Sequence, residues 1–272
     1  MIMFENIANE RRVRYEEIHG IKSSDFDKLV NSVNPESKHI ILDAGAGYGA
    51  VTREIIKRNT EKEIIYYIAD ISRSQLERAK IEIADVLKDY VKKYQVSYYQ
   101  DNIINSNFKE NSFDRVIAKM VIHEVKKEFQ QAAVFEMYRI LKPGGKLIVW
   151  DVYLDESVQH FVQAIIRKKD EIAGFCDLVD NRYLFNIEEI FKIIKKAGFN
   201  EIKKDFDLSY TFSTRKRMEA EFNGDLKKMN CLNDFIKSES LKYPNISKHL
   251  ELKITSNDIS LNIHKAIIIA SK

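Results

Sequence analysis

Apolar residues in the first 155 positions recur in two patterns, short apolar runs and longer segments with one apolar face. The short runs predict buried strands of a parallel sheet, because strands covered on both faces read as continuous apolar stretches. The one-sided segments predict helices. The predicted strands are 40–42, 64–69, 95–99, 113–118 and 146–150, and the predicted helices between them are 52–58, 72–87 and 127–141. This alternation predicts an α/β fold with a doubly wound, mostly parallel sheet.

Capping signals indicate several helix ends. Ser72 with Gln75 three residues later, and Asn186 with Glu189, each match the pattern of a capping box at a helix start. The Lys-Pro-Gly-Gly segment at 142–145 predicts a helix stop before the fifth strand, since proline cannot continue a helix and glycine favours its end.

The C-terminal part of the chain, 156–272, combines further helices with two more strands. One-sided apolar patterns predict helices at 158–172 and 186–197, and strands are predicted at 199–210 and 261–270. The interval between these strands is about fifty residues, far longer than a hairpin loop.

Apolar residues at helical spacing fill that interval, and they predict one or two helices inserted at about 213–258. Residues 1–34 also favour helix. We expect these two segments to form a helical lid over the mouth of the site, although the insertion could equally be the core of a small helical subdomain. The chain 1–272 is interpreted as a single domain with a core at 35–155.

The rest of the chain is organised around the stretch 40–50. An apolar run reaches Asp43 and then meets glycines at alternate positions, 45, 47 and 49. A strand, a glycine turn and a helix begin a nucleotide-binding βαβ unit, in which free backbone N–H groups face the ligand. The spacing of the glycines disfavours the dinucleotide-binding fingerprint, but Ala50 allows that fingerprint to match as well. This motif alone therefore does not exclude NAD as the ligand.

Polar residues follow the second and third predicted strands. Asp70 lies 21 residues after Gly49, where a carboxylate can accept both hydroxyls of a ribose. Asp101 and Asn102 end the third strand, where an acid or amide can hydrogen-bond the amine of adenine or simply form a turn. Because ligands of such sheets bind outside the carboxyl ends of the strands, these residues are expected to share one site.

Composition narrows the class of protein. The chain has 272 residues, 44% of them hydrophobic and 31% charged, which is typical of a globular domain. No apolar run reaches the roughly 18 residues of a membrane span. The net charge of +3 is too small to indicate nucleic acid, and the basic run 215–217 is interpreted as a solvated helix face. Two cysteines at unrelated positions indicate neither a disulfide framework nor a metal site, so we expect a cytoplasmic protein without membrane insertion.

Taken together, the motifs resemble the seven-stranded, class I S-adenosylmethionine-dependent methyltransferases, and within them the small-molecule branch with the ubiquinone/menaquinone-type enzymes. The resemblance covers 35–155 in register and 183–212 and 261–272 more loosely. It is carried by the Asp-Ala-Gly-Ala-Gly-Tyr-Gly segment at 43–49, Asp70, Asp101, the segment from Phe113-Asp114 to His123-Glu124, and Leu-Lys-Pro-Gly-Gly at 141–145.

The resemblance implies S-adenosyl-L-methionine as the cofactor. Gly45 and Gly47 would lie against its methionine part, and Asp43 would orient the glycine loop and the amino group. Lys119 would supply main-chain contacts near the sulfonium.

The nucleoside part of the cofactor would be held by the next two strand ends. Asp70 would bind the ribose hydroxyls, with Ile71 against adenine. Asp101 and Asn102 would face the adenine ring. An NAD-binding interpretation leaves Asp101 and the glycines at 144–145 unexplained.

Methyl transfer from a sulfonium is an in-line displacement, so the protein mainly positions the nucleophile. A general base is needed only if that nucleophile must lose a proton. His123 is the first candidate, because imidazole titrates near neutral pH, and a packing role is the alternative. Glu124 and Tyr15 are the other candidates. Asp151 either contacts substrate or ends its strand.

Three functions remain in competition. The first is methyl transfer to a small-molecule acceptor, with the substrate, the methylated atom and the oligomeric state unspecified. The second is an NAD(P)-dependent oxidoreductase, and the third is a non-catalytic cofactor-binding protein of the same fold. Cys176 lies where arsenite methyltransferases of this fold carry a thiol, but the chain lacks their further cysteines.

Overall fold

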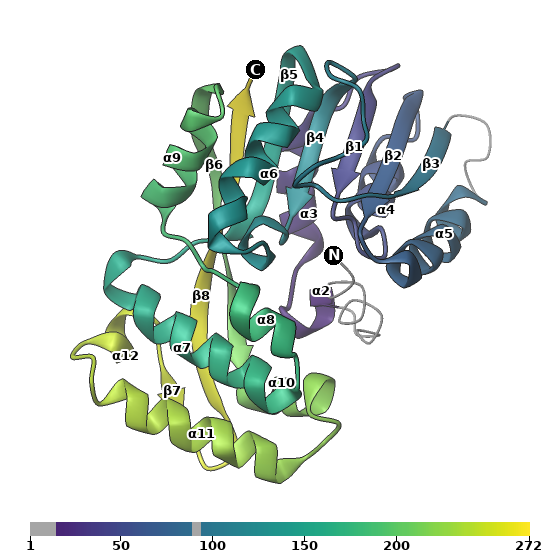
Figure 1. Ribbon diagram of the computed structural model, residues 1–272. Coiled ribbons are helices and arrows are strands. Elements are labelled where there is room, and N and C mark those ends of the chain that lie inside the picture. Colours follow the sequence, from purple (N-terminus) through teal and green to yellow (C-terminus); the bar gives the residue numbers. More distant parts are fainter. Residues whose placement is uncertain (1–14, 89–93) are drawn as a thin grey trace.

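The computed structural model describes residues 15–88 and 94–272, and its strands form one mixed sheet (Figure 1). The strand order is β3-β2-β1-β4-β5-β8-β6, with the short β7 paired to β8. β1 to β5 pair in parallel, and β8 lies antiparallel between β5 and β6. The strands are β1 Ile40–Ala44, β2 Ile64–Asp70, β3 Tyr94–Gln100, β4 Phe113–Lys119, β5 Leu141–Val152, β6 Asn200–Ser213, β7 Lys253–Ile254 and β8 Ile259–Ser271.

The α/β class and the mostly parallel sheet predicted from the sequence are confirmed, but the described chain has eight strands rather than seven. The additional strand is β7, which has two residues and pairs with Ile259 and Ser260 of β8. Its residues are exposed and show no apolar pattern, so no periodicity marks it in the sequence.

Helices cover both faces of the sheet. On one face lie α3 (Ser23–Val33), α4 (Ala50–Arg58) and α5 (Arg73–Leu87), whose apolar residues pack on Ile41, Tyr66 and Ile68. On the other face lie α6 (Lys127–Ile140) and α9 (Ile187–Lys196), packed on strands β1, β4 and β5. Burial on both faces explains why the central strands read as continuous apolar runs.

The Lys-Pro-Gly-Gly segment follows the end of a helix as predicted, but it also belongs to the next strand. The helix α6 ends at Ile140, but no loop follows, because β5 already begins at Leu141, which pairs with Phe113. The extra residues are absorbed by a register shift between Phe113 and Arg115. The N–H of Gly144 donates to the carbonyl of Lys272 at 3.0 Å, so the segment is part of the sheet.

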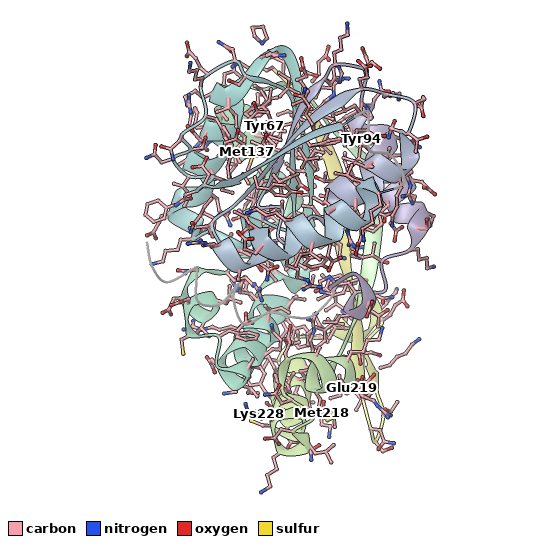
Figure 2. All side chains as sticks on the ribbon, turned by 90° about the vertical axis from the view of Figure 1, so that its right-hand side faces the viewer. Tyr67, Tyr94, Met137, Met218, Glu219 and Lys228 are labelled. Atoms are coloured by element: carbon pink, nitrogen blue, oxygen red, sulfur yellow. The ribbon has the colours of Figure 1, made fainter. Side chains whose placement is uncertain are left out.

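Beyond the sheet, the long strands β6 and β8 continue into a second layer of helices, seen in the lower half of Figure 1. Figure 2 shows the same two tiers from the side, with Tyr67 and Tyr94 in the upper tier and Met218, Glu219 and Lys228 in the lower. The insertion holds three helices, where one or two were expected. Helices of this lower tier are α7 Glu156–Ala173, α8 Cys176–Asn181, α10 Thr214–Glu221, α11 Leu226–Ser240 and α12 Ile246–His249.

A third apolar cluster holds the lower tier together. Phe161 and Ile165 of α7 and Leu232 and Ile236 of α11 are fully buried against Phe212. At roughly 1.5–3 kcal/mol for each large side chain taken out of water, this cluster is a substantial core of its own. Both interpretations of the insertion, a cover of the site and a helical core, are therefore compatible with its packing.

Candidate cofactor and substrate site

A cavity of about 270 Å³ opens at the carboxyl ends of β1, β2 and β4 and continues under the lower tier. Every site residue predicted from the sequence lines it, except Tyr15: Asp43, Gly45, Gly47, Asp70, Ile71, Asp101, Asn102, Lys119, His123 and Glu124. Tyr15 begins the short helix α2 (Tyr15–Ile18), and its side chain lies outside the described residues. Residues far apart in sequence thus meet at one edge of the sheet, as the α/β topology predicts.

The glycine loop after β1 combines two different constraints. Gly45 has φ +68°, and a Cβ there would lie 2.5 Å from a methyl carbon of Val121. Gly47 has φ +54°, and a Cβ there would meet nothing within 4 Å. Gly45 therefore lets the loop after β4 pack against the loop after β1, whereas Gly47 borders open space where a ligand can approach the backbone.

Asp70 closes the glycine loop from the end of β2. One carboxylate oxygen accepts from the N–H of Gly47 at 2.7 Å, and the other accepts from the N–H of Ser72 at 2.8 Å. Ser72 in turn caps α5 by accepting from the N–H of Gln75, as predicted. The carboxylate is therefore fixed at the cavity wall, where a carboxylate oxygen can in general accept more than one hydrogen bond.

Asp43 lies at the base of the cavity, 2% exposed. Its carboxylate accepts from the hydroxyl of Thr52 on α4 at 2.8 Å. Burial raises the pKa of Asp43 to about 6, although the Thr52 hydroxyl and the nearby Lys119 act in the opposite direction. A positively charged ligand group close to Asp43 would favour its ionised form.

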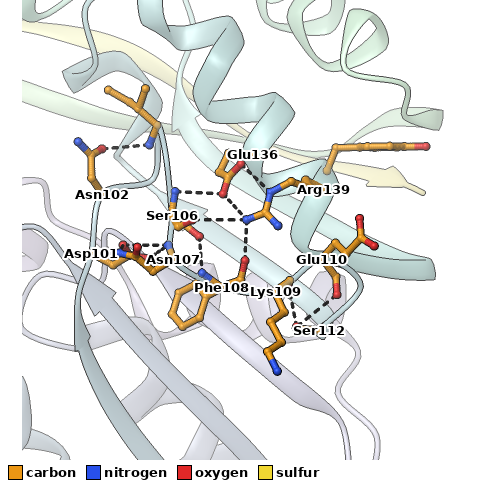
Figure 3. Close-up of polar contacts among 12 residues, drawn as sticks. Asp101, Asn102, Ser106, Asn107, Phe108, Lys109, Glu110, Ser112, Glu136 and Arg139 are labelled. Carbon is orange, nitrogen blue, oxygen red and sulfur yellow. Dashed lines mark hydrogen bonds and ion pairs between the residues drawn. The ribbon is translucent and has the colours of Figure 1, made fainter.

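The polar side chains in the loop after β3 form hydrogen bonds to other residues of the same loop (Figure 3). The Asp101 carboxylate accepts from the backbone N–H of Asn107 at 3.3 Å and from its side-chain amide at 3.1 Å. The Asn102 side chain accepts from the N–H of Ile104, which is a turn of the kind that Asx residues favour. Both residues line the cavity, but the structure shows them ordering the loop.

His123 and Asp151 form a buried pair. His123 lies in the single turn η1 (Ile122–Glu124) after β4, and its Nδ1 is 2.5 Å from a carboxylate oxygen of Asp151 on β5. Asp151 also accepts from the backbone N–H groups of Ile122 and Val152. The carboxylate therefore orients the imidazole and the turn that carries it, and within the described chain His123 Nε2 has no recorded hydrogen-bond partner.

Glu124 is the first member of a series of ion pairs that connects the turn after β4 to the helices of the lower tier. Its carboxylate binds Arg182 at 2.8 Å, and Arg182 also binds Asp170 of α7 at 2.9 Å. Asp170 binds Lys169 at 2.5 Å, and neither residue of that pair is more than 2% exposed.

Lys169 also forms an ion pair with Glu221 of α10, with 3.0 Å between the ammonium nitrogen and a carboxylate oxygen. Glu221 binds Arg217 on the next turn of α10 at 2.9 Å, and Arg217 lies 3.1 Å from Nε2 of His19. Because a guanidinium has no acceptor, His19 accepts this hydrogen bond. The imidazole of His19 also lies 4.2 Å from the ring of Tyr210 on β6.

Sequence reasoning missed most of the charged residues in this half of the cavity, and one expectation is wrong. Arg215 and Lys216 are exposed as expected, but Arg217 is 4% exposed and lines the cavity. Glu221 four residues later is the signal that could have identified it, since residues i and i+4 lie on one helix face. The short motifs of the sheet offered no guide to His19, which comes from a different part of the chain.

The cysteines have no role that the structure reveals. Cys176 and Cys231 are both exposed and form no disulfide. Among residues 15–88 and 94–272, no group of His, Cys, Asp and Glu side chains could hold a metal ion. The helices in these ranges include none with the length and apolar character needed to cross a membrane.

The sequence also matches a family of protein domains and several curated proteins that are methyltransferases. Residues 42–149 match the family model described as a methyltransferase domain. The ubiquinone/menaquinone biosynthesis C-methyltransferase of Wigglesworthia glossinidia brevipalpis is 30% identical over 156 residues, which cover 54% of this chain and 58% of that protein. The match covers 46% to 58% of the length of three of the curated relatives and only 3% to 6% of the length of several much longer ones.

Solved structures show the same fold. A crystal structure from Bacillus halodurans, named as a candidate methyltransferase, superposes with a TM-score of 0.75 at 21% identity and covers 92% of this chain and 99% of its own. Phosphoethanolamine N-methyltransferase 2 of Haemonchus contortus, in complex with S-adenosyl-L-methionine, gives a TM-score of 0.56 at 20% identity and covers 98% of this chain and 60% of its own. Residues 42–149 therefore form a methyltransferase domain, and the chain has the fold of the solved methyltransferase structures.

Proposed function

We propose that this protein transfers a methyl group from S-adenosyl-L-methionine to a small-molecule acceptor. One observation carries the proposal: a single cavity joins the glycine loop and Asp70 to the His123–Asp151 pair and to charged residues of the lower tier. Groups suited to bind a nucleotide and a group suited to accept a proton therefore border the same cavity. We also propose that the lower-tier helices belong to the same domain as the sheet and shape its acceptor end.

Residues at the sheet edge would hold the cofactor. Gly45 and Gly47 would border its methionine part, with the Asp43 carboxylate facing the amino group. Asp70 would accept from the ribose hydroxyls while keeping its bond to Gly47. Lys119 would contribute through its main chain.

The end of β3 has an indirect part in this proposal. Asp101 and Asn102 hold the loop that closes the nucleoside end of the cavity, and Ile71 and Ile103 supply apolar wall. Adenine would therefore meet a surface that these two side chains shape.

The cofactor supplies an activated methyl group with a neutral leaving group, so the protein's own task is to orient the acceptor and accept its proton. His123 suits this task because Asp151 binds Nδ1 and so favours the tautomer with Nε2 as the acceptor. Glu124 is less suited, since Arg182 stabilises its carboxylate. Tyr15 stays a candidate from the sequence alone.

Thermal unfolding with added ligand tests the proposal. S-adenosylhomocysteine at about 100 times its dissociation constant should stabilise the fold by about 2.7 kcal/mol, whereas NAD should leave the melting temperature unchanged. Formation of S-adenosylhomocysteine over a panel of small acceptors then distinguishes an enzyme from a non-catalytic binding protein. Stabilisation by NAD alone would favour the oxidoreductase.

A further inference from the structure

Lys265 is a fully buried lysine in the middle of β8. It is 1% exposed and pairs with Val152 of β5 on one side and Leu208 of β6 on the other. Directly opposed residues of antiparallel strands point to the same sheet face, so Lys265 shares its face with Val152, which lines the cavity. Its ammonium lies 4.3 Å from the ring centre of Tyr210, another cavity residue.

The described residues offer the Lys265 ammonium no hydrogen bond and no ion pair. Buried charges in proteins are normally paired, because an unpaired ion loses its hydration without compensation. Asp25 and Asp151 are the acids that act on it from a distance, and the Asp151 carboxylate is already bound to His123 and to backbone N–H groups. Within residues 15–88 and 94–272 the ammonium is therefore left without an anionic partner, and an anion supplied by a ligand would favour its charged form.

Two further cations face the same region, Lys119 from the end of β4 and Arg217 from α10. Burial first, and then the charges of Lys119 and Arg217, lower the pKa of Lys265 to about 7. Burial and the charges of Lys265, Arg217 and Lys119 also hold the pKa of His19 well below its ordinary value. The pKa values of Lys265 and His19 are thus both lowered by neighbouring positive charges. One of these charges, on Arg217, is paired with the carboxylate of Glu221.

We propose that the acceptor half of the cavity recognises a substrate with an anionic group, a carboxylate or a phosphate. The anion would be held where Lys119 and Arg217 line the cavity and where Lys265 lies next to the lining residues Val152 and Tyr210. This inference rests on the proposed function and names its substrate class. The remaining lining is mostly apolar and would receive an apolar body: Met120, Val121, Val125, Ile166, Leu178 and Leu184.

Matched probes test the inference. Calorimetric titrations compare 4-hydroxybenzoate with its neutral counterpart 4-hydroxybenzamide, and phenyl phosphate serves as the phosphate probe. Each titration uses the protein alone and the protein with S-adenosylhomocysteine. We expect at least one anion to bind about tenfold or more tightly than the amide, as for a hydrogen bond to a charged group. The tighter of the two anions identifies the group.

The Lys265→Met variant should lose this preference and should not melt earlier, because an apolar side chain replaces a buried charge. Lys265→Gln is the second variant, and Lys216→Met, on the exposed side of α10, is the control that should retain the preference. Equal binding of the anions and the amide, no binding of any probe at millimolar concentration, or an unchanged preference in both Lys265 variants would overturn the inference.

The titrations distinguish a failure of the proposed function from a failure of the inference about the anionic substrate. If S-adenosylhomocysteine gives no heat, the proposed function fails, while the preference for anions in the protein alone still decides the inference. If S-adenosylhomocysteine binds and the anions are not preferred, methyl transfer stands and the acceptor is not an anion.

Discussion

Gly45 and Gly47 share a left-handed backbone conformation but differ in what surrounds them. Alanine in that conformation costs about 1–2 kcal/mol at either position. At Gly45 the new methyl would also clash with Val121, so Gly45→Ala should destabilise the protein more than Gly47→Ala does. Gly47→Ala should fold and should bind S-adenosylhomocysteine more weakly. Chemical denaturation and calorimetry of both variants check this, and equal stabilities would remove the Val121 clash from the explanation.

Asp43 predicts opposite pH effects on stability and on binding. Its pKa is raised from 3.8 to about 6 in the folded chain, so the folded state binds the proton more tightly. The stability this provides is complete below pH 3.8 and is lost as the pH rises through about 6, by up to about 3 kcal/mol. Cofactor affinity should instead fall as the pH drops below about 6, because the ionised carboxylate attracts the amino group.

Asp43→Asn is the matching variant for this prediction. Denaturation and calorimetry between pH 3.8 and pH 7 should show both pH dependences weakened in the variant. A wild-type affinity that is constant over this range would contradict the placement of Asp43 at the amino group.

His123 is predicted to act in turnover and not in cofactor binding. His123→Ala should bind S-adenosylhomocysteine as the wild type does, and it should slow methyl transfer about 10²–10⁴-fold if the acceptor must lose a proton. His160→Ala, at an exposed position on α7, is the control. Single-turnover rates over a range of pH provide the measurement, and a full wild-type rate at all pH values would reduce His123 to a structural residue.

At the scale of elements, the sequence predicted best those features that depend only on neighbouring residues, such as the end of a helix. The Asn186 side chain accepts from the N–H of Glu189 at 2.9 Å, and the Glu189 carboxylate accepts from the N–H of Asn186 at 2.9 Å, which confirms the predicted capping box. The start of β5 was misplaced, because its pairing with Phe113 is a contact between distant residues. Local propensity does not encode such a contact.

The capping box gives a prediction that is independent of function. Asn186→Ala should lower the free energy of unfolding by about 1 kcal/mol, since the first turn of α9 loses its side-chain acceptor. Asn230→Ala, at an exposed position inside α11, should be neutral or slightly stabilising because alanine favours a helix interior. Urea unfolding compares the two, and equal effects would mean that the box contributes nothing.

At the scale of the whole molecule, the sheet and the lower tier meet at the cavity and supply different halves of it. The residues that line the cavity at the strand ends could be predicted from sequence, because each follows a recognisable strand and parallel strands end at one edge. The residues that line it under the lower tier could not, since His19, Arg182 and Arg217 come from separate elements whose meeting depends on tertiary packing. The ion pairs from Glu124 to Arg217 connect these elements beneath the cavity.

Calorimetric titration of the intact protein with S-adenosyl-L-methionine, and separately with NAD, tests the central claim most directly. We predict one binding site with micromolar affinity for S-adenosyl-L-methionine and no heat from NAD. The Asp70→Ala variant should bind at least about tenfold more weakly, since it removes a charged acceptor from the ribose. Heat from NAD alone, or no binding of S-adenosyl-L-methionine by a folded protein, would contradict the claim.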